Sequence, residues 1–203
     1  MTSPTASDAK LLTVLDQTME TAVARSGSWL ACRPGCTPCC VGVFAISALD
    51  AERLREGLAR LAASDSGRGR AVLERAASAR ERLAVNFPGN PETGRLATDD
   101  ENFDERFADY ANDEVCPVLD PTTGLCELYA ARPVTCRSFG PPVYSKDGIA
   151  VCELCFVGAE PEVVEQAAVS LAAATELEEQ LTPAAEQRTG LHGQTLIAFA
   201  LSQ

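Results

Sequence analysis

Residues 32–40 read Cys-Arg-Pro-Gly-Cys-Thr-Pro-Cys-Cys, a C-x3-C-x2-C-C pattern with glycine and proline between the thiols. A C-x2-C pair such as Cys36 and Cys39 lets two thiolates converge on one metal ion through a single tight turn. The adjacent pair Cys39 and Cys40 is harder to place on one ion, because neighbouring side chains alternate in a strand and diverge in a turn. This stretch therefore predicts an irregular metal-binding loop and favours two neighbouring sites or a polynuclear cluster.

A second group of cysteines follows between residues 116 and 155, and it ends in another C-x2-C pair. All nine cysteines of the chain fall between residues 32 and 155, whereas cysteines that merely fill a core would be scattered. We therefore expect one composite metal site that takes ligands from both groups. The candidate ligands are Cys32, Cys36, Cys39, Cys40, Cys116, Cys126, Cys136, Cys152 and Cys155.

Other interpretations of the cysteines stay open. Any single cysteine can be a small buried apolar side chain. A complete disulfide framework would leave one of the nine thiols over, and the first ten residues, MTSPTASDAK, lack a charged-then-apolar export signal. A C-x2-C pair also serves thiol oxidoreductases, but neither pair has the strand and helix setting of a thioredoxin-like site. In the reducing cytoplasm, where we expect this protein, clustered thiols more often bind metal.

Helical periodicity surrounds the cysteine groups and predicts a mainly α fold. The expected helices cover residues 8–25 (Leu12, Leu15, Met19 and Val23 on one stripe), 47–61 (Ser47 as N-cap), 72–83, 99–111 and 161–177. Thr182-Pro183 resembles the start of a last helix. Residues 29–46 and 115–156 are rich in Pro, Gly and Cys, and we expect loops, turns and short strands there. The length of 203 residues predicts a single domain over residues 1–203, with a cysteine-cluster region at about 29–156 and a helical C-terminal extension at 160–203.

Composition excludes several functions. Acidic residues outnumber basic ones by 29 to 17, so the formal charge of −12 disfavours nucleic acid as a partner. No apolar run approaches the roughly 20 residues that a membrane span needs, so we expect no membrane partner. Apolar residues make up 46% of the chain, which allows a sizeable core.

Three pieces of the sequence together resemble the YkgJ-like cysteine-cluster family, whose members are described as zinc- or iron-chelating proteins and sometimes as Fe–S-cluster proteins. The first piece is the 32–40 pattern followed by Phe-Ala-Ile-Ser-Ala-Leu-Asp at 44–50. The second is Cys-Pro-Val-Leu-Asp at 116–120 with Gly-Leu-Cys-Glu-Leu-Tyr-Ala-Ala-Arg-Pro-Val-Thr-Cys-Arg-Ser-Phe-Gly at 124–140. The third is the closing pair at 152–155. The resemblance spans roughly residues 30–156 and implies cysteine-ligated metal without assigning a reaction.

Residues near the thiols are expected to support the site. Arg132 and Arg137 flank Cys136, and their guanidinium groups would stabilise thiolates in an already acidic protein. Tyr129 could donate its hydroxyl to a ligand sulfur. A surface arginine pair and a packed tyrosine are the alternative.

The leading hypothesis is a metal-binding protein with a zinc or iron site, an Fe–S cluster being one form of it. A second hypothesis is an enzyme, either an Fe–S oxidoreductase or a protein-modifying enzyme of the kind found in the related flagellin lysine methylases. A third is a structural zinc module that binds a partner protein. Catalytic residues, the protein partner and the oligomeric state are not readable from the sequence.

Overall fold

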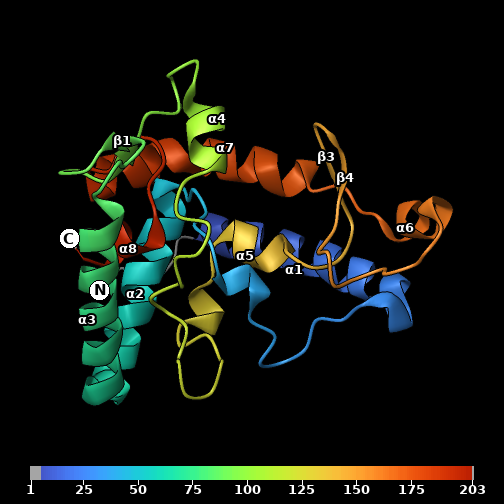
Figure 1. Cartoon of the computed structure of the whole chain (residues 1–203), viewed down its shortest axis with the longest axis horizontal. Coiled ribbons are helices and arrows are strands. Elements are labelled where there is room, and N and C mark those ends of the chain that lie inside the picture. The colour runs from blue at the N-terminus through green and yellow to red at the C-terminus, as the bar shows by residue number, and fades with distance from the viewer. Residues whose placement is uncertain (1–5, 203) are drawn as a thin grey trace. The chain divides into compact units, whose positions relative to one another are not determined.

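The computed structural model describes residues 6–202, which divide into two compact units (Figure 1). Unit 1 combines Met1–Pro34 with Val134–Leu181, and unit 2 combines Gly35–Pro133 with Thr182–Gln203. Each unit is thus built from two stretches that are far apart in the sequence. The single domain expected over residues 1–203 stays a prediction.

Helices dominate the described residues, which confirms the mainly α expectation. Unit 1 contains α1 (Ala6–Ser26), the 3₁₀ turn η1 (Gly27–Trp29), α5 (Val134–Ser138), α6 (Pro161–Ala167) and the hairpin of β3 (Val143–Ser145) with β4 (Gly148–Ala150). Unit 2 contains η2 (Pro38–Cys40), α2 (Ala48–Ser64), α3 (Ser66–Leu83), α4 (Phe103–Ala108), η3 (Tyr129–Ala131), α8 (Ile197–Leu201) and the hairpin of β1 (Gly89–Asn90) with β2 (Arg95–Leu96). Helix α7 (Ala172–Thr189) begins in unit 1 and ends in unit 2. None of the helices described here is both long enough and apolar enough to cross a membrane.

The centre of unit 2 is formed by α2, α3 and α8, which pack against one another. Helix α2 begins where the sequence predicted, because the Ser47 hydroxyl accepts a hydrogen bond from the Asp50 backbone N–H at 3.2 Å. The inner face of α3 also matches the prediction. Its buried positions are Gly69, Val72, Ala76, Ala79 and Leu83.

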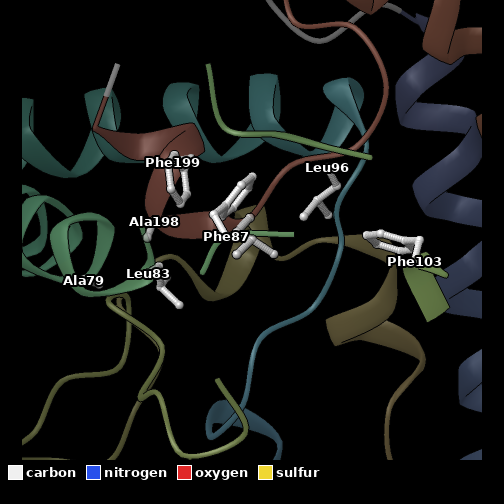
Figure 2. Packing of buried hydrophobic residues seen from close by; sticks show 8 residues of the cluster. Ala79, Leu83, Phe87, Leu96, Phe103, Ala198 and Phe199 are labelled. Atoms are coloured by element: carbon white, nitrogen blue, oxygen red, sulfur yellow. The ribbon is translucent and has the colours of Figure 1, made fainter. Parts of the chain in front are cut away.

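A cluster of apolar side chains joins the end of α3 to the C-terminal helix (Figure 2). Phe87 and Phe199 lie with ring centroids 4.6 Å apart, and Leu96 of β2 is completely buried beside them. Gly94 is required here, because a Cβ at that position would lie 2.7 Å from the Phe199 side chain and its φ is +74°. The small β1–β2 hairpin is therefore held closely against the C-terminal helix.

Four details of the helix predictions are wrong. The buried stripe of α1 contains the predicted Leu15 and Met19, but it continues through Leu11 and Ala22 rather than Leu12 and Val23, and Val23 is 46% exposed. Helix α4 ends at Ala108, because the chain turns into a left-handed conformation at Ala111 (φ 51°). These two errors leave the fold class unchanged.

The other two errors lie after residue 160, where one helix was predicted over 161–177 and a new start at residue 182. The structure breaks the segment between α6 and α7, because Val169 pairs with Val143 and accepts a hydrogen bond from Tyr144 N at 3.0 Å. Helix α7 begins at Ala172, where the Ser170 hydroxyl accepts from the backbone N–H at 3.2 Å, and Pro183 lies inside it. Tertiary pairing to β3 overrides the local helical pattern.

Candidate metal centre

The first cysteine loop of unit 2 is a 3₁₀ turn that brings two adjacent thiols together. Cys40 N donates to Thr37 O at 2.7 Å, and Val41 N donates to Pro38 O at 3.1 Å. Within this turn the Cys40 thiol donates a hydrogen bond to the Cys39 sulfur. The expectation that adjacent thiols diverge in a turn is therefore wrong here, because the two side chains hydrogen-bond to each other within the single 3₁₀ turn Pro38–Cys40.

The second cysteine segment of unit 2 pairs directly with this turn. Cys116 N donates to Cys40 O at 2.8 Å, and Gly42 N donates to Glu114 O at 2.9 Å. Residues 116–128 then fold back on themselves, with Leu119 paired to Cys126. Cys116 and Cys126 thereby come close enough to Cys39 and Cys40 for their charges to interact. Four of the nine predicted ligands thus lie in one neighbourhood.

Hydrogen bonding and burial give these four thiols different proton affinities. The hydrogen bond from Cys40 lowers the pKa of Cys39 to about 6, with the nearby Arg132 guanidinium acting in the same direction. The same hydrogen bond, together with burial, raises the pKa of Cys40. Burial raises the pKa of Cys116 to about 11 and also raises the pKa of Cys126. At neutral pH the group therefore holds one thiolate, on Cys39, and three thiols.

Arg132 and Tyr129 lie beside this group, where the sequence predicted supporting residues. The Arg132 guanidinium stacks over the Tyr129 ring at 3.6 Å from its centroid, and its Nε donates to Tyr129 O at 3.1 Å. Its charge adds to the lowering of the pKa of Cys39. At Cys126 it opposes the burial that raises the pKa of that thiol. The cation is therefore placed where it favours the ionised form of two sulfurs. The tyrosine ring serves as a platform for the guanidinium.

Glu127 and Arg75, which the sequence analysis did not single out, hold the second segment in place. The Glu127 side chain is only 5% exposed and is paired with Arg75 and Arg68, the latter at 3.0 Å. Arg75 Nε also donates to Pro117 O at 2.9 Å. One feature of the sequence could have indicated these residues. Glu127 directly follows Cys126, and a carboxylate next to a thiolate is stabilised by nearby cations.

Four other predicted ligands belong to unit 1. Cys152 and Cys155 are buried in a tight turn, with Cys155 N donating to Cys152 O at 2.8 Å, and the Cys155 sulfur accepts from Ala31 N at 3.4 Å. Cys32 lies against Gly140, where a Cβ would come within 2.6 Å of the Cys32 sulfur. Cys136 lies in the middle of α5 and is half-buried. Their role as ligands stays a prediction.

Two predicted residues remain, Cys36 and Arg137. Cys36 is half-buried in unit 2, in the loop that leads into η2. Arg137, which was expected to support thiolates, forms an ion pair with Asp16 of α1 at 3.0 Å. Cys32 and Cys36, neighbours in the sequence pattern, belong to different units.

The donor set fits a soft transition metal, because four sulfurs with an adjacent cation are the chemistry of zinc and iron sites. Within residues 6–202, no three Cys, His, Asp or Glu side chains stand in an arrangement that encloses an ion as it is. Binding would therefore have to draw the sulfurs inward.

Residues 31–156 match the family model CxxCxxCC, described as "Putative zinc- or iron-chelating domain". The match covers more than half of the chain and includes all nine cysteines. The chain belongs to the CxxCxxCC family. Membership confirms the resemblance drawn from the sequence and supports cysteine-ligated binding of a metal ion, zinc or iron. No curated protein and no solved structure matches the chain significantly.

Proposed function

We propose that this member of the CxxCxxCC family binds a single zinc or iron ion through the sulfurs of Cys39, Cys40, Cys116 and Cys126. The observation that carries the proposal is the backbone pairing that brings these four cysteines together, with Cys116 N donating to Cys40 O at 2.8 Å and Cys126 paired to Leu119. Four sulfur ligands complete a tetrahedral shell, so no other donor is needed.

The contact between Cys39 and Cys40 favours one ion over a [4Fe–4S] cluster. A tetrahedral ion with metal–sulfur bonds of about 2.3 Å holds its sulfurs roughly 3.8 Å apart, close to the separation of hydrogen-bonded thiols. In a [4Fe–4S] cluster each cysteine binds a different iron, which spreads the sulfurs further apart, whereas each iron of a [2Fe–2S] cluster binds two. The hydrogen bond between the adjacent thiols therefore supports two sulfurs on one metal ion, and sulfide analysis separates a mononuclear site from a [2Fe–2S] cluster.

Charge also supports the proposal. Four thiolates around a divalent ion leave two negative charges, which is costly in a chain already at −12. Arg132 lies close enough to lower the pKa of Cys39 and Cys126, and it would offset one of these charges. The Cys39 thiolate supplies a first ligand at neutral pH, and the other three thiols would release protons as they bind.

The test is metal and sulfide analysis of the protein purified without oxygen, together with single serine variants. We expect no acid-labile sulfide in the wild-type protein. We expect Cys39→Ser and Cys40→Ser each to lose about one metal equivalent relative to wild type, because both sulfurs bind the same ion.

Cys36→Ser is the matched control, since it removes a thiol from the same loop outside the proposed ligand set, and it should keep the wild-type metal content. Full metal retention by Cys39→Ser or Cys40→Ser would overturn the assignment of that residue. Acid-labile sulfide in a stoichiometric ratio to iron would show that the site holds an Fe–S cluster and not a single ion.

A further inference from the structure

Arg75 of α3 contacts both cysteine-bearing arms of the 116–128 segment. Its Nε donates to the carbonyl oxygen of Pro117, the residue after Cys116, at 2.9 Å. Its Nη2 is paired with the carboxylate of Glu127, the residue after Cys126. One planar guanidinium therefore joins the residues that follow two of the proposed ligands.

The two arms are also paired with each other through the backbone. Glu127 N donates to Val118 O at 2.9 Å, and Asp120 N donates to Leu125 O at 2.9 Å. The turn between them closes through Gly124 (φ 68°), whose backbone N–H donates to Asp120 O at 2.9 Å. This short hairpin has few ladder bonds, and a two-stranded hairpin is only marginally stable alone. An external fixing point would therefore have a large effect on where its sulfurs lie.

Helix α3 provides a rigid base for that fixing point. Val72 and Ala76, on either side of Arg75 in the sequence, are completely buried in unit 2. Arg75 itself is 30% exposed, while the Glu127 side chain that it meets is 5% exposed. An ion pair with a carboxylate this buried resists screening by solvent, and the loss of Arg75 leaves Glu127 paired with the more exposed Arg68 alone.

We propose that Arg75 is a positioning residue that sets the separation of the Cys116 and Cys126 sulfurs and thereby the metal affinity of the four-thiol site. The guanidinium has a fixed fork geometry, so it can hold two acceptors at a defined spacing, which a flexible ammonium group cannot do. Arg75 does not bind the metal. It acts through the residues next to two ligands.

Arg68 provides a sharp comparison, because it pairs with the same Glu127 carboxylate at 3.0 Å. Arg75 contacts Pro117 as well as Glu127, so only the Arg75 guanidinium joins the two arms through these bonds. If neutralising Glu127 were the whole effect, Arg68→Met and Arg75→Met would weaken the site equally. If Arg75 joins the two arms, Arg75→Met lowers the metal affinity more than Arg68→Met does. Arg70→Met removes the same charge from an exposed position of the same helix and serves as the baseline.

This inference rests on the proposed metal site, so the experiment has one readout with metal and one without. The first is Co²⁺ titration followed by the sulfur-to-cobalt charge-transfer band, with Zn²⁺ competition to obtain affinity. The second is hydrogen exchange of the metal-free protein over residues 116–119 and 125–128.

For Arg75→Met we expect affinity to fall by about 10- to 100-fold, the range found when groups that orient metal ligands are removed. We expect faster exchange in both arms. Arg68→Met should lose less affinity and exchange faster only over residues 125–128, while Arg70→Met should match the wild-type protein in both readouts.

Wild-type affinity in Arg75→Met, or an effect equal to that of Arg68→Met, would overturn the inference. If the wild-type protein binds neither Co²⁺ nor Zn²⁺, the proposed function fails, and exchange alone decides the role of Arg75. Faster exchange in both arms then supports the joining role, whereas exchange that changes in one arm or in neither overturns it.

Discussion

Single residues determine how ready the four thiols are to take a metal ion. Cys40 and Arg132 together lower the pKa of Cys39 to about 6, so this sulfur is a thiolate at neutral pH. Burial acts in the opposite direction on Cys116, whose pKa rises to about 11. In the proposed site the Cys39 thiolate would be the first ligand, and the buried thiols would bind only when the metal compensates for their lost protons.

Tyr110 is a second residue whose ionisation is tied to the fold. Its hydroxyl donates a hydrogen bond to the carbonyl oxygen of Leu83, and its ring meets Phe87 edge-on at 6.2 Å. Burial, with a contribution from the Glu114 carboxylate, raises the pKa of Tyr110 to about 12. The neutral phenol is therefore the form that the folded protein favours.

We predict that Tyr110 contributes stability at and below pH 10 and that this contribution is lost as the pH rises towards 12. An unfolded tyrosine ionises near pH 10, whereas the folded one ionises near 12, so alkali favours the unfolded chain across this window. Tyr110→Phe should cost about 0.5–1.5 kcal/mol at pH 7 through the lost hydrogen bond. The difference in the free energy of unfolding between the wild-type protein and Tyr110→Phe should narrow from pH 10 to 12.

Urea unfolding at a series of pH values measures this gap. Tyr144→Phe, at an exposed tyrosine, is the control and should change the free energy of unfolding only slightly at pH 7. A gap for Tyr110→Phe that is constant from pH 9 to 12 would show that the folded protein does not favour the neutral phenol.

At the scale of elements, the contact between α2 and η3 positions the segment that carries Arg132. Gly57 of α2 lies against Ala131, and a Cβ at position 57 would stand 2.5 Å from the Ala131 Cβ. Ala131 is buried, and its Cβ is attached directly to the backbone, so it cannot move without moving η3. The missing side chain at Gly57 is what allows the turn to approach the helix.

We predict that Gly57→Ala lowers the free energy of unfolding by about 1–2 kcal/mol. Overpacking costs about 1–3 kcal/mol, and the better helix propensity of alanine recovers about 1 kcal/mol at most. The double variant Gly57→Ala/Ala131→Gly should recover part of the loss, because it removes the clashing methyl group. Chemical denaturation measures both effects.

Gly67→Ala is the matched control for this substitution. It lies in the first turn of α3, where the nearest atom to an added Cβ is an Asp65 carboxylate oxygen at 3.4 Å. We expect its stability to be unchanged or raised by up to about 1 kcal/mol. A loss in Gly67→Ala as large as that in Gly57→Ala would rule out the close approach to η3 as the cause.

At the scale of the whole molecule, regular structure and cysteines occupy different parts of the chain. The long helices α2 and α3 pack on each other and carry no cysteine, whereas the cysteines lie in loops, short turns and, for Cys136, the five-residue helix α5. Irregular segments of this kind gain most from a metal cross-link, so we expect metal binding to contribute part of their folding free energy.

We predict that complete removal of the metal lowers the melting temperature and increases hydrogen exchange mainly over residues 29–46 and 115–156. Helices α3 and α8 should stay partly formed, because the core cluster that joins them contains no cysteine. Hydrogen exchange with mass spectrometry, before and after chelation under reducing conditions, measures this, with the amides of α2 and α3 as the internal control. Unchanged exchange in the two cysteine segments after full metal loss would contradict the prediction.

Local patterns were sufficient to predict the fold class, the helices α2 and α3 and the N-cap at Ser47. These features depend on residues within one or two turns of each other, and helical spacing and side-chain capping act over that range. The same local reasoning failed at Val169, which pairs with Val143, and after the end of α4, where Ala111 packs against the core cluster of unit 2. Distant contacts outweighed local preference there.

The sequence by itself determined that this chain carries a cysteine-based metal-binding region, because the C-x3-C-x2-C-C pattern and the 116–140 motif are specific enough to identify the family. Only the tertiary structure decided which thiols meet. Cys32 and Cys36 are four positions apart yet belong to different units, while Cys40 and Cys116 are joined by a backbone hydrogen bond. Spacing along the chain limits what one loop can do, but long-range backbone pairing and packing against helices such as α3 determine which loops come together.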